Sequence, residues 1–310
     1  MSANPPLHLI VPFAQCSDEG WLQATTHLLL KNLAQLLRGM KLINTDTGPA
    51  DSLSPPHERV FAKAYGLTSA DGLIPCAALE AKANLHEAWA LITPCHWAMG
   101  REHATLTDPA MLDLNEADSQ TLLAAMQPYF ATDGITLHYW QPTRWLARGD
   151  VFGSLPTASP DRVLGRNVDR WLPASKAIKL LQNEMQMLLY THPVNDERSA
   201  KGERSVNSFW VSGSGALTET VTVKPLVNIN RCLAPSAFAN DWAAYAAAWT
   251  QLDAFEIAAL LAQQHSGKTV RLSLCGDTSA MTFETTQHGI LTQLKSAISP
   301  LRPINVLKQL

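Results

Sequence analysis

The sequence is short of charge. Only 16% of its 310 residues are charged, and the net charge is −3. A protein that binds nucleic acid over a broad face needs a surplus of Lys and Arg, because these side chains replace the counterions of the phosphates. The composition therefore argues against such a face and leaves only local basic patches. Nucleic acid is not an expected partner.

The sequence also lacks paired cysteines and long apolar runs. Its five cysteines are widely spaced and form no CxxC pair, which is typical of reduced thiols in a cytoplasm rather than of a disulfide framework. No apolar run approaches the roughly 20 residues that cross a bilayer. Residues 1–6 lack the basic start and apolar core of a secretion signal. We therefore expect a cytoplasmic protein without a membrane partner.

Hydrophobic residues make up 46% of the chain, which is enough to bury a large core. Apolar periodicity predicts helices over residues 21–38, 56–65, 115–130, 175–191, 237–249, 253–264 and 290–298. Strands are predicted over residues 8–13, 88–93, 105–106, 135–140, 144–147, 208–212, 221–228, 269–275 and 281–285. Residues 41–56 are polar and rich in Pro and Gly, which predicts a loop.

Alternating strands and helices indicate an α/β fold with a mixed, largely parallel sheet flanked by helices. We expect a single α/β unit over residues 1–310, with a weak division near residues 150–175. Within it, Ser175 is a candidate N-cap for the helix over 175–191.

The most informative segment, residues 192–215, follows that helix. Arg offers a planar fork of donors, Asn offers a donor and an acceptor, and Gly allows a close backbone approach, so the mixture suits an oxyanion such as phosphate. The residues are His192, Asn195, Arg198 and Asn207, with Gly202, Gly213 and Gly215. Because Pro193 should end the preceding helix, we expect Asn195, Arg198 and Asn207 to project from a loop. The alternative is that they only satisfy backbone groups of a helix end and its loop.

A second candidate group lies just after the strand over 88–93. His96 with His103 could bind a metal, and Cys95 with His96 could form a nucleophile and base. Adjacent strand residues face opposite sides, however, and Cys is commonly buried. Contact with a ligand through His96 or Arg101 is the simpler expectation.

Two Arg-containing groups complete the candidates. Residues 54–59 (SPPHER) suit the start of a helix, and their His and Arg could add to an anion site. Arg162 and Arg166, with Arg144 and Arg148, could hold phosphates, although an exposed Arg beside Asp is usually a solvated pair.

Residues 192–215 also carry a resemblance. The run HPVNDER, followed by Gly202, Asn207, Trp210 and Gly213-x-Gly215, is similar to a segment of the archaeal-type cofactor-independent phosphoglycerate mutases of the alkaline phosphatase superfamily. Over nearly its whole length the chain resembles the RpfE-type bacterial regulatory proteins, which are often labelled phosphoglycerate mutase because of this segment. The matching blocks are residues 53–59, 91–97, 144–147, 156–162 and 182–184, running into 192–215.

The mutase resemblance implies a degenerate alkaline-phosphatase-like core and two divalent metals, Mn or Zn, around a Ser that becomes phosphorylated. The sequence departs from that pattern. The first predicted strand has no carboxylate after it until Asp18, no Asp-His or His-Asp dipeptide occurs, and no His stands beside Asp277. We therefore expect no metal site, no cofactor and no catalytic residues.

These observations lead to one main hypothesis: an RpfE-type regulatory protein, a non-catalytic relative of the mutases, that binds a small phosphorylated ligand or a protein partner. The expected ligand-binding residues are His192, Asn195, Arg198, Asn207 and His96, with Arg162 and Arg166 as outer contacts. Two alternatives stay open: an active metal-dependent phosphoglycerate mutase or phosphatase, with Mn or Zn, and an interaction scaffold without a ligand.

Overall fold

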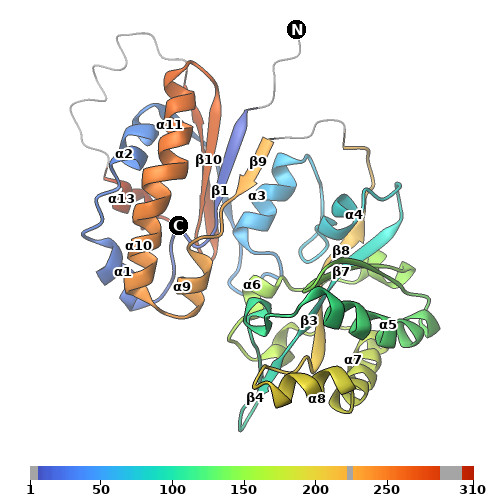
Figure 1. Ribbon diagram of the computed structural model, residues 1–310. Coiled ribbons are helices and arrows are strands. Elements are labelled where there is room, and N and C mark those ends of the chain that lie inside the picture. Colours follow the sequence, from blue (N-terminus) through green and yellow to red (C-terminus); the bar gives the residue numbers. More distant parts are fainter. Residues whose placement is uncertain (1–5, 222–225, 287–301) are drawn as a thin grey trace. The chain divides into compact units, whose positions relative to one another are not determined.

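The computed structural model describes residues 6–221, 226–286 and 302–310 (Figure 1). It divides the chain into two compact units: a first unit of residues 1–51, 55–67 and 221–310, and a second unit of residues 52–54 and 68–220. From the sequence we expected a single unit with a weak division near residues 150–175. Those residues lie inside the second unit, which is a single insertion into the first apart from residues 55–67.

The first unit is built around a five-stranded sheet with the order β2-β11-β10-β1-β9. Strand β1 runs parallel to β9 and β10, whereas β10, β11 and β2 pair antiparallel. The elements are β1 (Leu7–Val11), α1 (Glu19–Thr25), α2 (Lys31–Arg38), β2 (Met40–Thr47), α3 (Pro56–Ala64), β9 (Leu226–Ile229), α9 (Ala234–Phe238), α10 (Trp242–Leu252), the π-helical turn η4 (Asp253–Ile257), α11 (Ala258–His265), β10 (Val270–Cys275), β11 (Ser279–Thr285) and α13 (Pro303–Leu307).

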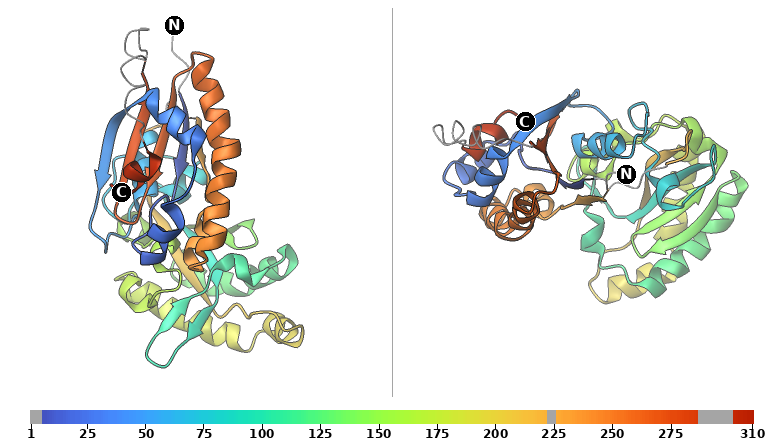
Figure 2. Two further views of the ribbon diagram at one scale, coloured as in Figure 1. Left: turned by 90° about the vertical axis from the view of Figure 1, so that its left-hand side faces the viewer. Right: turned by 90° about the horizontal axis from the view of Figure 1, so that it is seen from above.

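Helices cover both faces of this sheet. Leu9 and Val11 of β1 pack with residues of α2, α10 and α11 on one face, while Ile10 packs with Val60 of α3 on the other. Figure 2 shows α10, η4 and α11 as one long orange helix beside the sheet. Successive side chains of a strand point to opposite faces of the sheet. Because helices cover both faces of this sheet, β1 is apolar on both sides over residues 9–11, which form a continuous apolar run.

The second unit holds an antiparallel sheet with the order β6-β7-β3-β8 and a separate hairpin of β4 and β5. Helices α5 and α7 pack their apolar sides on one face of the sheet. The elements are α4 (Cys76–Glu80), β3 (Ala88–Cys95), β4 (Trp97–Met99), β5 (Ala104–Leu106), η1 (Pro109–Leu112), α5 (Glu116–Thr132), β6 (Thr136–Gln141), β7 (Arg144–Arg148), η2 (Asp150–Ser154), α6 (Pro160–Val163), η3 (Val168–Trp171), α7 (Lys176–Tyr190), α8 (Pro193–Ala200) and β8 (Ser208–Ala216).

The predicted α/β class with a mixed sheet flanked by helices is confirmed. The sheet was predicted to be largely parallel, but among the described strands only the two pairings of β1 are parallel. Strand β3 is antiparallel and yet apolar throughout, because α5 and α7 cover one face of it, while Leu91 packs with Ala77 of α4 on the other.

Several local predictions need correction. Residues 41–56 were expected to be a loop, but β2 pairs with β11 at the sheet edge. The helix predicted over residues 21–38 is two helices, α1 and α2. The helix predicted over residues 290–298 lies outside the described residues, as do residues 222–225 of the strand predicted over 221–228. None of the described helices combines the length and apolar character needed to span a bilayer.

Candidate binding cleft

Residues 193–200, expected to be part of a loop, form helix α8. Pro193 stands in its first turn, and the Nδ1 atom of His192 accepts a hydrogen bond from the backbone N–H of Val194 at 3.2 Å. Pro is well suited to this position because the first-turn N–H has no partner within the helix and the φ angle of Pro is already helical. Asn195 and Arg198 therefore point from a helix into the protein, and both are buried.

Asn195 ties α8 to the segment that leads into β8. Its Nδ2 atom donates to the carbonyl of Val206 at 2.7 Å and to that of Leu189 at 2.8 Å, and its Oδ1 atom accepts from the N–H of Val206 at 2.8 Å. The side-chain amide is thus fully engaged by backbone groups. Asn195 fixes the geometry of this region.

Asn207 makes a matching connection to β4. Its Oδ1 atom accepts from the N–H of Trp97 at 2.7 Å, and its Nδ2 atom donates to the carbonyl of Trp97 at 3.0 Å. Nearby, the Nδ1 atom of His96 lies 2.9 Å from the carbonyl of Ser205. Since a carbonyl only accepts, Nδ1 carries the proton in this contact. Asn207 and His96 together position β4 beside residues 205–207.

Arg198 is almost completely buried, with 1% of its side chain exposed. Its Nε atom donates to the carbonyl of Arg204 at 2.8 Å, and Nη2 donates to the carbonyl of Leu112. Its Nη1 atom lies 3.1 Å from Glu203 and 3.5 Å from Asp118. The guanidinium therefore joins α8, α5 and the segment before β8, with its charge met by two carboxylates.

These contacts form the walls of a cleft of about 450 Å³. We call it the α7–α8 cleft. Its lining combines apolar side chains with neutral polar ones and a single carboxylate, and no Lys or Arg. The lining residues are Trp97, Met99, Gln186, Leu189, Tyr190, Asn195, Asp196, Ser199, Ser205 and Asn207. Figure 1 shows the three elements that supply most of them, β4, α7 and α8, close together.

The structure brings together five of the predicted site residues. Asn195 and Asn207 line the α7–α8 cleft, and His192, His96 and Arg198 support the elements around it. The sequence gives little sign of the other lining residues, because Tyr190 and Asp196 lie on solvent-exposed faces of their helices. The one sequence feature that points to the cleft is the pair of large side chains Met187 and Tyr190, which are three positions apart on α7 and exposed.

Arg162 and Arg166 are not part of this cleft lining. Arg162 is buried in α6, and Arg166 is exposed in the turn that follows. That turn runs along β5, because Leu106 pairs with Leu164 and Thr105 with Asn167.

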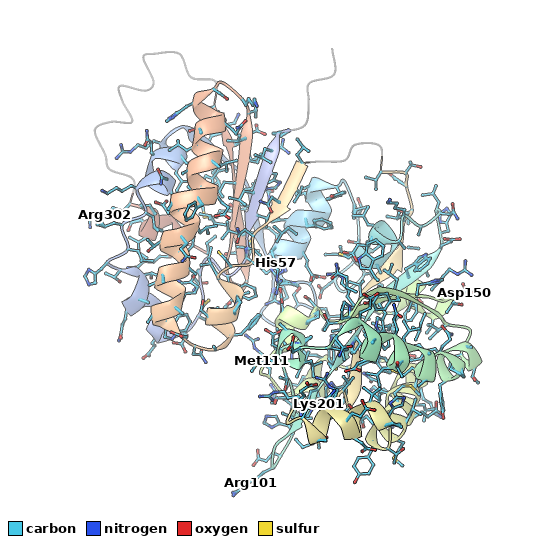
Figure 3. The ribbon with its side chains drawn as sticks, in the orientation of Figure 1. His57, Arg101, Met111, Asp150, Lys201 and Arg302 are labelled. Carbon is cyan, nitrogen blue, oxygen red and sulfur yellow. The ribbon has the colours of Figure 1, made fainter. Side chains whose placement is uncertain are left out.

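The other candidate groups are dispersed. Arg144 pairs with Glu80 at 2.7 Å, and Arg59 pairs with Asp46 at 2.6 Å. Arg101 stands at the tip of the β4–β5 hairpin and points away from the fold (Figure 3). Cys95 is fully buried, and burial raises the pKa of its thiol. It is therefore protonated at neutral pH rather than a thiolate nucleophile.

Within residues 6–221, 226–286 and 302–310, no three His, Cys, Asp or Glu side chains come together to hold a metal ion. These residues do not fit the two-metal centre that the mutase resemblance implies.

Comparison with known proteins gives similarities in structure only. Neither a protein-family model nor a curated relative matches the sequence. The chain is similar in structure to a cofactor-independent phosphoglycerate mutase from Thermoplasma acidophilum, with 13% identity, a TM-score of 0.36, and coverage of 98% of this chain and 99% of that chain. It is also similar to the PH0037 protein from Pyrococcus horikoshii, with 8% identity, a TM-score of 0.49, and coverage of 94% and 93%. Both scores are low, so the roles of the residues rest on the contacts described above.

Proposed function

We propose that this chain is a regulatory binding protein of the RpfE type, a relative of the cofactor-independent phosphoglycerate mutases that does not catalyse phosphoryl transfer. Its α7–α8 cleft binds a segment of a protein partner. Asn195, Asn207 and His96 act as positioning residues, because their side chains hold the walls of the cleft in place. His192 and Arg198 hold α8 in place in the same way.

The observation that carries the proposal is the lining of the cleft. A phosphorylated ligand is commonly held by cationic side chains, and Arg is the usual choice for phosphate. The cleft lining contains none, and the guanidinium of Arg198 faces Asp118 and Glu203 instead. Trp, Tyr and Met side chains, by contrast, are enriched where proteins bind other proteins. Of the two ligand classes expected from the sequence, a protein partner therefore fits the cleft better.

The test uses random peptides displayed on phage as the probe and the full-length protein as the target. We expect selected peptides to bind the wild-type protein and to lose binding in Ser199→Trp, which fills the cleft from an exposed position of α8. The matched control is Ala200→Trp, next to it on α8, exposed and outside the cleft lining.

The alternatives make different predictions for the same sample. We expect that 3-phosphoglycerate does not displace the peptides. We also expect that the protein does not convert 3-phosphoglycerate to 2-phosphoglycerate in the presence of Mn²⁺ or Zn²⁺. Displacement would instead assign a phosphorylated ligand to the cleft, and turnover would establish an active mutase. Absence of any cleft-dependent peptide would contradict the proposal.

A further inference from the structure

We propose that the partner enters the α7–α8 cleft as an extended polypeptide segment, which pairs with the open edge of β4 and places a Lys or Arg side chain beside Asp196. This inference rests on the proposed function, because it assumes that the cleft binds protein. It specifies the backbone conformation and the charge of the bound segment.

The hydrogen bonds of the β4–β5 hairpin define which edge of β4 is open. The N–H of Thr107 donates to the carbonyl of His96 at 3.0 Å, and the N–H of Gly100 donates to the carbonyl of His103 at 3.0 Å. Residues 96 and 100 therefore direct their backbone groups toward β5. Because alternate residues of an antiparallel strand direct these groups to opposite sides, Trp97 and Met99 direct theirs away from β5.

Asn207 already occupies the first position along this edge. Its side-chain amide both donates to and accepts from the backbone of Trp97, as a residue of a neighbouring strand would. The next outward-facing position is Met99. No group in the described part of the chain makes a hydrogen bond to the backbone of Met99 on this side. Such unpaired edge groups are a ready template for an added strand.

Exposed apolar side chains surround this open position. Met99 is 80% exposed and Tyr190 is 84% exposed, and both line the cleft. Met187, 74% exposed and one helical turn before Tyr190, extends the apolar surface along α7. A strand added at β4 would direct every second side chain toward this surface, where Met and Tyr adapt well to an apolar partner.

The charge of the lining specifies the second feature of the partner. Asp196 is the single charged residue among the residues that line the cleft, and it is exposed. A basic side chain is complementary to it, whereas an acidic segment would be repelled. An exposed ion pair contributes little affinity but selects the sign of the charge.

The first experiment measures the charge preference of the phage-selected peptides. We expect Lys or Arg to be enriched in them, and Asp196→Asn to weaken their binding by about fivefold, as for an exposed ion pair. Glu197→Gln is the matched control, because Glu197 is the neighbouring exposed acid but does not line the cleft. Equal effects of the two substitutions would contradict the charge assignment.

The second experiment measures backbone pairing on the unaltered protein. Peptides that are N-methylated at one position at a time should lose about tenfold in affinity at a single position, because only one peptide N–H can donate to the open carbonyl of Met99. Uniform sensitivity or none would contradict strand addition. Met99→Pro should weaken binding by a similar factor, whereas Met99→Leu keeps the backbone N–H and should not.

Met99→Pro is expected to fold, because the N–H that it removes points away from β5. Ala98→Pro should instead disrupt the hairpin, because Ala98 faces Thr105 of β5. Ser199→Trp separates the two proposals. If no selected peptide loses affinity in Ser199→Trp relative to Ala200→Trp, the proposed function fails. If peptides do lose affinity in Ser199→Trp but show neither basic enrichment nor sensitivity to N-methylation at one position, only the present inference fails.

Discussion

The first unit and helix α8 of the second unit both bury polar side chains, but these side chains find their partners at different distances along the chain. In the first unit, the Nε2 atom of His8 lies 2.8 Å from Ser273, which is 265 positions away. Asp253 likewise accepts from the backbone N–H of Leu33, 220 positions away. In the second unit, Asn195 and Arg198 reach backbone groups only 6 to 11 positions away, although Arg198 also reaches Leu112.

This difference explains why the start of the segment, residues 192–198, attracts attention in the sequence. Polar residues that stabilise a fold through local contacts necessarily cluster in sequence, and such a cluster is hard to distinguish from a ligand site. The polar contacts of the first unit are scattered and form no motif. A dense polar motif is therefore also what a locally stabilised helix and loop require.

Among the substitutions that test this comparison, Arg198→Met should have the largest effect on stability. We expect the substitution to lower the free energy of unfolding by about 3 kcal/mol, because buried carbonyls lose their donors and two carboxylates lose their partner. Urea unfolding of the full-length protein measures the change. Arg166→Met, at an exposed position, should change it by less than about 0.5 kcal/mol. Equal stabilities of wild type and Arg198→Met would return Arg198 to the ligand candidates.

The second prediction concerns His8 and pH. Burial, assisted by the charge of Arg271, lowers the pKa of His8 from 6.5 to about 4. The unfolded chain therefore takes up a proton near pH 6.5 while the folded chain does not. Stability from this residue is fully present above pH 6.5 and is lost as the pH falls toward 4, by about 3 kcal/mol in total.

Urea unfolding at several pH values tests this prediction. His8→Gln cannot take up the proton, so its stability should fall less steeply between pH 6.5 and 4 than that of the wild type. Parallel pH dependences would show that burial in the first unit does not lower the pKa of His8.

The third prediction compares a distant helix cap with a local one. Asp253 of η4 accepts from the N–H groups of Asn32 and Leu33 at the start of α2, whereas Asp241 caps its own helix α10 through Ala244. We expect Asp253→Ala to cost about 2 kcal/mol and Asp241→Ala about 1 kcal/mol, since Asp253 is buried and also joins two helices. Thermal unfolding measures both, and a larger loss for Asp241→Ala would contradict this ranking.

The smallest effect concerns Gly213, one of the glycines considered from the sequence for a close backbone approach to an oxyanion. Gly213 and Gly165 both have left-handed φ angles, +58° and +70°, so Ala costs about 1 kcal/mol at either position. A Cβ at Gly213 would also come within 3.2 Å of Cys76 and Leu91, whereas at Gly165 it would meet nothing within 4 Å. Gly213→Ala should therefore be the less stable variant in urea. Equal stabilities would argue against a packing role for Gly213.

Much of the fold could be predicted because its signals are local. Leucine periodicity predicted α7, and the hydroxyl of Ser175 does cap it by accepting from the N–H of Ile178 at 3.3 Å. Helix α8 was missed because Pro193 was taken as the end of one helix rather than as the first turn of the next. The edge strand β2 was missed because its polar residues meet a neighbouring strand on one side only, so little burial is required of them.

The cleft was harder to predict than the helices. Its lining comes from β4, α7, α8 and residues 205–207, and no periodicity shows that these segments meet. The sequence indicated the residues that hold them together, such as Asn207, but not the residues that face the cleft, such as Tyr190.

The π-helical turn η4 fixes the rotational phase between α10 and α11. A π turn carries one residue more than a regular helix, and each residue advances an α-helix by about 100°. If the same residues closed up into a regular α-helix, the surplus residue would turn α11 by that angle. Leu260 and Leu261 would then leave the core of the first unit. By accommodating one surplus residue, the π turn keeps the apolar sides of α10 and α11 directed toward the same sheet.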